Sequence, residues 1–189
     1  MANFTAVFDA CVLYPAPLRD LLISVATTEQ FRARWTNEIH DEWVRNLLKN
    51  RDDITEEQLQ RTVEMMNQAV PDCLVENYDG YIESLELPDP DDRHVLAAAM
   101  KCQADVIVTN NLKDFPIDVL IKYDIDVQSP DIFLSHLFDL NQATFCSAVR
   151  EMRVRLQNPP YTTEELLELL YKQGLPLIVS KLKEVIDLI

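Results

Sequence analysis

Three aspartates, Asp9, Asp92 and Asp114, stand where side chains from different parts of the chain can meet. Asp9 follows an apolar, β-rich run that ends at Phe8, and Asp114 lies in a turn shortly after a second run of this kind. Carboxylate oxygens are the ligands that hard divalent cations prefer, and carboxylates crowded together repel one another unless a cation neutralises them. These residues therefore indicate a site for a divalent metal ion.

The elements that must position these aspartates are strands and helices in alternation. Strands are predicted at residues 4–8, 74–76, 105–109 and 125–127, the second and fourth on weaker patterns. Helical patterns separate them, and this alternation predicts an α/β protein with a parallel sheet. Ligands of such sheets bind beyond the carboxyl ends of the strands, so Asp9 and Asn111 are expected at one edge.

The helices have start signals in the sequence. Thr36 precedes a helix predicted over residues 38–48, and Asp91 or Asp92 is expected to cap a helix over residues 93–102. The second helix has apolar residues broadly spaced, as in a helix buried against a sheet. Because this helix leads into the strand at 105–109, Asp92 is expected near the site.

Glu42 is placed less firmly by its position in a helix. At about 100° per residue it lies about 60° from Ile39, at the margin of the apolar stripe formed by Ile39, Trp43 and Leu47. Helical periodicity therefore permits an inward-facing carboxylate at this position without requiring one.

The last part of the chain has a helical pattern. A helix is predicted over residues 141–156, and another begins at Thr162 after two prolines. The segment after the prolines has too many apolar side chains for a solvated arm, so it must pack on the protein or on a partner. We expect two units, an α/β domain at residues 1–140 and a C-terminal helical extension at residues 141–189.

The composition excludes several classes of function. The net charge of −15 argues against broad attraction to nucleic acid, which usually needs a basic face. Two glycines are too few for a glycine-rich phosphate-binding loop, and four cysteines and three histidines lack the spacing of zinc sites. The apolar runs are too short to span a membrane and the N-terminus lacks a signal-peptide pattern, which predicts a cytoplasmic protein.

Four segments of the chain resemble the PIN-domain nucleases. They are VFD at residues 7–9, WTNEIHDE at 35–42, LPDPDDRHVLAAA at 87–99 and IVTNNLKDF at 107–115. The resemblance covers roughly residues 3–135 and is to the stand-alone toxins of toxin–antitoxin pairs. It implies a PIN-like three-layer fold, with a central, mostly parallel sheet flanked by helices.

The resemblance also implies a site. The family uses an early strand-end Asp, a helical Glu, an Asp that opens an alanine-rich helix, and a turn with Thr, Asn and Asp. Carried over by position, the catalytic residues are Asp9, Glu42, Asp92 and Asp114. Of these, Asp9, Asp92 and Asp114 are the metal ligands, and Thr109 and Asn111 support them. Asp91 remains an alternative to Asp92, and Glu38 to Glu42.

The activity implied by the resemblance is hydrolysis of RNA phosphodiesters by an endoribonuclease that uses Mg²⁺ or Mn²⁺. Its expected partners are an RNA substrate, an antitoxin protein and a second copy of the chain, with no membrane. An intact set of acidic residues counts against the alternative, a PIN-like scaffold that binds RNA or a protein without cutting.

Local basic groups must hold the substrate of so acidic a protein. The candidates are Arg19, Arg32, Arg34, Arg45, Lys49, Arg51, Arg93 and Lys113. Arg93 and Lys113 adjoin proposed metal ligands and are preferred, with Arg45 third.

Overall fold

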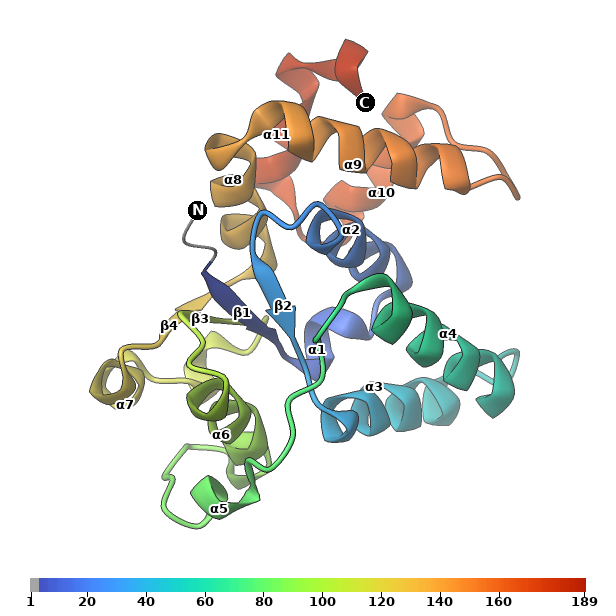
Figure 1. The fold of residues 1–189 in the computed structure, drawn as a ribbon. Helices are drawn as coiled ribbons and strands as arrows, with labels where there is room; N and C mark the ends of the chain where they lie inside the picture. Colours follow the sequence, from blue (N-terminus) through green and yellow to red (C-terminus); the bar gives the residue numbers. More distant parts are fainter. Residues whose placement is uncertain (1–3) are drawn as a thin grey trace.

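A four-stranded sheet forms the centre of the protein. The computed structural model describes residues 4–189. The strands are β1 (Thr5–Phe8), β2 (Arg32–Arg34), β3 (Val106–Val108) and β4 (Asp126–Gln128). Their order is β2-β1-β3-β4 and each pairing is parallel, so the carboxyl ends of the strands meet at one edge (Figure 1).

Three of the four predicted strands are confirmed, as β1, β3 and β4, with bounds that differ by a residue or so. The prediction at residues 74–76 was wrong, because Leu74 makes a single parallel bridge with Trp35. The chain then turns away at Asn77, which has a positive φ of 58°. The strand missed is β2, whose two arginines flank one alanine and hide the apolar pattern of a strand.

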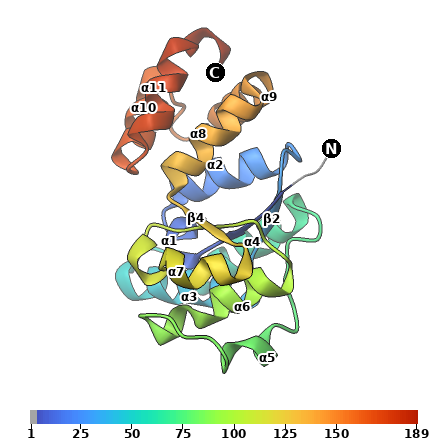
Figure 2. The same ribbon diagram turned by 90° about the vertical axis from the view of Figure 1, so that its left-hand side faces the viewer.

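Helices cover both faces of the sheet. They are α1 (Ala10–Leu13), α2 (Ala16–Ala26), α3 (Asn37–Asn50), α4 (Glu56–Ala69), α5 (Asp79–Ile82), α6 (Arg93–Lys101), α7 (Ile117–Leu120), α8 (Pro130–Leu140), α9 (Gln142–Arg155), α10 (Thr163–Lys172) and α11 (Pro176–Glu184). Short 3₁₀ turns are η1 (Pro90–Asp92), η2 (Leu112–Asp114), η3 (Ile121–Tyr123) and η4 (Ile186–Leu188). Helix α2 lies on one face of the sheet and α6 on the other, with α9, α10 and α11 beyond α2 (Figure 2). The predicted three-layer α/β fold with a parallel sheet and a C-terminal helical extension is confirmed.

Two local features bring helices to the edge where the strands end. Thr36, two residues after the end of β2, accepts a hydrogen bond from the Ile39 N–H at 3.0 Å and so starts α3, as predicted. Helix α6 packs against β1 and β3 through a fully buried run of small residues, 97–99. Because alanine side chains are short, the helix approaches the sheet closely and its first residue stays near the strand ends.

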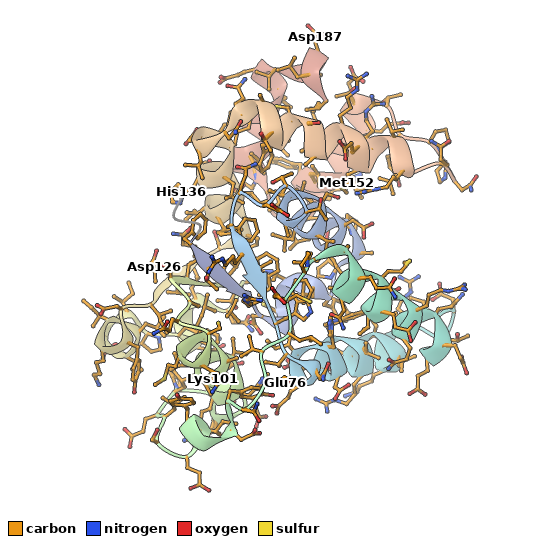
Figure 3. The ribbon with its side chains drawn as sticks, in the orientation of Figure 1. Glu76, Lys101, Asp126, His136, Met152 and Asp187 are labelled. Carbon is orange, nitrogen blue, oxygen red and sulfur yellow. The ribbon has the colours of Figure 1, made fainter. Side chains whose placement is uncertain are left out.

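The C-terminal helices pack on the rest of the chain. Helices α9 and α10 contact α2, and Arg155 of α9 donates to Ser24 Oγ of α2 at 2.5 Å. Met152, labelled in Figure 3, is among the buried side chains of α9. Phe133 of α8 packs edge-on against Phe8 of β1, with ring centroids 6.0 Å apart. The extension therefore shares a core with the sheet, while the proposed division between residues 140 and 141 stays a prediction.

No helix within residues 4–189 has both the length and the apolar character needed to cross a membrane.

Candidate active site

Asp9 stands directly beyond the end of β1 and is 2 % exposed. Its backbone N–H donates to the carbonyl oxygen of Val108 at 3.1 Å, which extends the pairing of β1 with β3. Although Asp9 occupies the N-cap position of α1, its side chain makes no capping hydrogen bond. Its Oδ2 instead accepts from Thr109 Oγ1 at 2.7 Å and from Cys11 Sγ at 3.0 Å. The carboxylate is therefore held across the strand ends and is not used to start a helix.

Thr109 and Cys11 connect the loops that follow β1 and β3. The Asn111 N–H donates to Thr109 Oγ1 at 2.9 Å, and the Asn110 N–H donates to Cys11 Sγ at 3.2 Å. Burial, with Asp9 beside it, raises the pKa of the Cys11 thiol, which therefore stays protonated at neutral pH and can donate. These bonds fix the turn after β3 relative to Asp9, which is the kind of support expected of Thr109 and Asn111.

Asp92 is the last residue of η1 and the N-cap residue of α6, as expected for Asp91 or Asp92. Its side chain makes no capping bond to α6. Asp89 accepts from the Asp91 N–H at 2.9 Å and starts η1. The Asp92 carboxylate is thus free of the local role that an aspartate at a helix start usually has.

The environment of Asp92 is strongly negative. Burial, followed by the charges of nearby carboxylates, raises the pKa of Asp92 to about 7. Those carboxylates belong to Asp9, Asp89, Asp114 and Glu42. Asp9, Asp114 and Glu42 therefore lie close enough to act on Asp92, although the four residues come from four separate segments.

Asp114 ends the turn η2 and is half-buried. Its backbone N–H donates to the Asn111 carbonyl at 2.9 Å, so the turn is closed on itself. The side chain of Asn111 is exposed, and this residue is tied to the site through its backbone bond to Thr109.

The geometry separates the two pairs of alternatives. Glu42, and not Glu38, is among the charges that raise the pKa of Asp92. Glu38 instead accepts a hydrogen bond from Tyr78 Oη at 2.9 Å. Asp91 is exposed and lines a neighbouring cleft. These observations favour Asp92 and Glu42 as the residues of the proposed site.

A cleft of about 600 Å³ opens beside Glu42. Arg45 lies in its wall, among several carboxylates, and is suitably placed to face a phosphate. Lys113 is exposed on η2, between Asn111 and Asp114. Arg93 is half-buried, and its Nε has no hydrogen-bond partner within the described residues. The three preferred basic residues thus all lie near the carboxylates.

Arg19 is not available to a substrate, so its inclusion among the basic candidates was wrong. Its guanidinium is buried, donates to the Leu13 carbonyl at 2.7 Å and lies 4.7 Å from the centroid of the Trp43 ring. Arg19 is therefore a structural residue that joins α2 to α1 and α3.

The donor set fits a hard divalent cation. Within residues 4–189, no three His, Cys, Asp or Glu side chains lie close enough to hold a metal ion together. Mg²⁺ does not need three, because it keeps several waters and takes one or two carboxylates directly. In the same part of the chain, no Lys or Arg forms an ion pair with Asp9, Asp92 or Asp114. The negative charge of the cluster is therefore left for a cation to neutralise.

Two residues near the site were not singled out from the sequence. Cys11 stands two residues after Asp9, and His94 stands two residues after Asp92. His94 is buried, with Nε2 3.5 Å from Glu42 Oε2. Burial lowers the pKa of His94, but the nearby carboxylates outweigh it, so this pKa lies above its ordinary value. Proximity in sequence to Asp9 and Asp92 was the one available signal for both.

Comparison with known proteins connects this site to a family. A family model described as PIN domain matches residues 5–113, and a model described as VapC50 C-terminal domain matches residues 130–184. The second match takes in α8 as well as the helices after residue 140.

A curated relative is also named VapC50. The chain is 44% identical over 82 residues to a protein of Mycobacterium tuberculosis named "Putative ribonuclease VapC50". The aligned part covers 43% of this chain and 48% of that protein, so the chain spans about half the length of the curated relative it matches. No solved structure matches the chain.

Proposed function

Because the chain belongs to the PIN-domain family, we propose that it is an Mg²⁺- or Mn²⁺-dependent endoribonuclease that acts in the cytoplasm as the toxin of a toxin–antitoxin pair. The observation that carries the proposal is that Asp9, Asp114 and Glu42 lie near Asp92, while no Lys or Arg of residues 4–189 forms an ion pair with the three aspartates. The relative from Mycobacterium tuberculosis, named as a ribonuclease, supports RNA as the substrate.

The proposed roles follow from the position of each side chain. Of Asp9, Asp92 and Asp114, one or two would bind the ion directly and the others would bind it through its waters, and Thr109 keeps Asp9 in place through its 2.7 Å hydrogen bond. A bound divalent ion polarises the phosphate and lowers the pKa of the attacking water. We assign to Glu42, which lines the cleft, the role of accepting a proton from the attacking water. The resemblance implies products with a 5′-phosphate and a 3′-hydroxyl.

Substrate binding is assigned to Arg45, Lys113 and Arg93, which surround the carboxylates. Their few positive charges on an acidic protein suit a nuclease that selects its RNA more than one that binds any RNA. A toxin also needs an antitoxin protein that blocks cleavage, and a second copy of the chain is the other proposed partner.

The test is a cleavage assay with a closely matched pair of variants. Purified protein is incubated with structured RNAs and single-stranded DNA, with Mg²⁺ or Mn²⁺ and in parallel with a chelator. Asp92→Asn is expected to abolish cleavage, whereas Asp91→Asn, one residue away and exposed, is expected to retain it. The two variants remove one charge each, so a difference between them reports the site and not the net charge.

The outcomes separate the nuclease from its alternative. Cleavage that survives both the chelator and Asp92→Asn would rule out the proposed mechanism. Binding of RNA without cleavage of any substrate would instead identify a PIN-like scaffold.

A further inference from the structure

His94 lies between two glutamates of a different helix. It belongs to α6 and is 6 % exposed, while Glu38 and Glu42 belong to α3. His94 Nε2 lies 3.5 Å from Glu42 Oε2, and His94 Nδ1 lies 3.8 Å from Glu38 Oε2. The imidazole therefore connects the helix that begins at Asp92 with the helix that supplies Glu42.

Glu42 depends on this contact for its orientation. Its side chain is one-third exposed, and across residues 4–189 its one polar side-chain partner is His94. A glutamate has three rotatable side-chain bonds, so a carboxylate without a partner samples several positions. The contact with His94, two residues after Asp92, keeps the Glu42 carboxylate beside the start of α6.

The imidazole is a rigid support for such a contact. Helix α6 packs on β1 and β3, and the ring of His94 is buried at its start. On the other side Glu38 is already bound by Tyr78 Oη at 2.9 Å. His94 Nδ1 has no hydrogen-bond partner in the described part of the chain, because 3.8 Å to Glu38 is too long for a hydrogen bond. Nε2 is therefore the atom through which His94 acts.

We propose that His94 is a positioning residue that holds the Glu42 carboxylate toward Asp9, Asp92 and Asp114. The proposal rests on the proposed nuclease function and deepens it. His94 touches neither RNA nor the ion in this role, and its effect on cleavage passes through Glu42. The residue links the two helices at the edge where the site is assembled.

Three substitutions separate the two nitrogens of the ring. The amide nitrogen of Gln lies near the place of Nε2, that of Asn lies near the place of Nδ1, and Leu has neither. We expect His94→Leu and His94→Asn to lower kcat by about 10- to 100-fold with KM unchanged, as for residues that orient a catalytic group. His94→Gln is expected to retain most of the activity. Equal losses in all three variants, or a loss confined to KM, would contradict the proposal.

A double-mutant cycle shows whether His94 acts through Glu42. If it does, His94→Leu combined with Glu42→Gln lowers kcat no further than Glu42→Gln alone. Losses that multiply would show that His94 acts by another route. Glu38→Gln is the matched control on the same helix: any loss that it causes is expected to multiply with that of His94→Leu, since Glu38 is bonded to Tyr78.

A second measurement needs neither RNA nor metal. Carbon relaxation of the Glu42 side chain, recorded by NMR on the metal-free protein, reports how ordered this side chain is. High order is expected in the wild type and in His94→Gln, and low order in His94→Leu. If the wild type cleaves no RNA, the proposed function fails, but unchanged order of Glu42 in His94→Leu is what overturns the role of His94. Thermal unfolding of each variant verifies that it is folded.

Discussion

Two buried aspartates, Asp9 at the sheet edge and Asp131 in the C-terminal helices, differ in how their negative charge is stabilised. Asp9 is 2 % exposed and Asp131 is 7 % exposed, so each has lost most of its contact with water. Asp131 accepts two backbone hydrogen bonds, from the Leu177 N–H at 2.9 Å and the Ile178 N–H at 3.0 Å. These N–H groups belong to the start of α11, where the helix dipole also favours a negative charge.

Asp9 has no such partners. It accepts from one hydroxyl and one thiol, and it lies close enough to Asp92 for the two charges to interact. A buried carboxylate bonded to peptide N–H groups at a helix start has its negative charge stabilised by the protein itself. A carboxylate among like charges needs a bound cation to neutralise it. The comparison therefore distinguishes a buried acid that stabilises the fold from one that is available for chemistry.

The largest expected effect is that of Asp9→Asn on RNA cleavage. This change removes the charge of a proposed metal ligand and keeps its shape, so kcat is expected to fall on the order of 1000-fold. Thermal unfolding without metal is expected to stay the same or move to higher temperature, because repulsion within the cluster is relieved. Retained cleavage would place the chemistry elsewhere.

Divalent ions are expected to stabilise the protein by binding at Asp9 and not at Asp131. Mn²⁺ at 100 times its dissociation constant adds about 2.7 kcal/mol to the free energy of unfolding. The shift, measured by calorimetry, is expected to remain in Asp131→Asn and to be lost in Asp9→Asn. Equal shifts in both variants would show that the ions bind away from the cluster.

Thr109 sharpens the comparison, because its hydroxyl is a neutral donor to Asp9. Thr109→Val keeps the shape of the side chain but removes the bonds to the Asp9 carboxylate and the Asn111 N–H. Cleavage is expected to fall by about 10- to 100-fold, and Thr109→Ser is expected to restore most of it. If serine and valine behave alike, the hydroxyl has no part in the site.

The smallest effect is expected at Asp131, whose carboxylate is already bonded to backbone N–H groups. In Asp131→Asn one side-chain oxygen is replaced by an NH₂ group, which cannot accept a hydrogen bond from the start of α11. The free energy of unfolding is expected to fall by about 1–2 kcal/mol, while cleavage stays unchanged. Chemical denaturation and the RNA assay measure the two quantities on one preparation. A loss of cleavage without a loss of stability would contradict the distinction between Asp131 as a residue that stabilises the fold and Asp9 as one available for chemistry.

Much of the fold follows from local patterns in the sequence. The apolar runs that end at Phe8 and Val108 form adjacent parallel strands, and Thr36 starts its helix as expected. Where the pattern was weak it misled, since β2 with its two arginines was missed and Leu74 forms a bridge in place of a strand. Pairing with a neighbouring strand, which no local pattern contains, decided both cases.

The residues of the proposed site likewise differ in whether local patterns in the sequence could place them. Asp9 and Asp114 could be placed from the strands that precede them, and Glu42 only from family resemblance. The contact of His94 with Glu42 and that of Cys11 with Thr109 could not be predicted, because they join segments 52 and 98 residues apart that the sheet brings together. Whether these residues act in catalysis stays a prediction.

Helix α2 belongs to both halves of the molecule. Near its start Arg19 stacks on Trp43 and bonds the end of α1, and near its end Ser24 accepts from Arg155 of α9. Its apolar face would be uncovered if the C-terminal helices were lost, and its loosening would release Trp43. We therefore expect the two matched family segments to unfold together as one cooperative unit, so that the heat resistance of the site depends in part on helices that lie away from it.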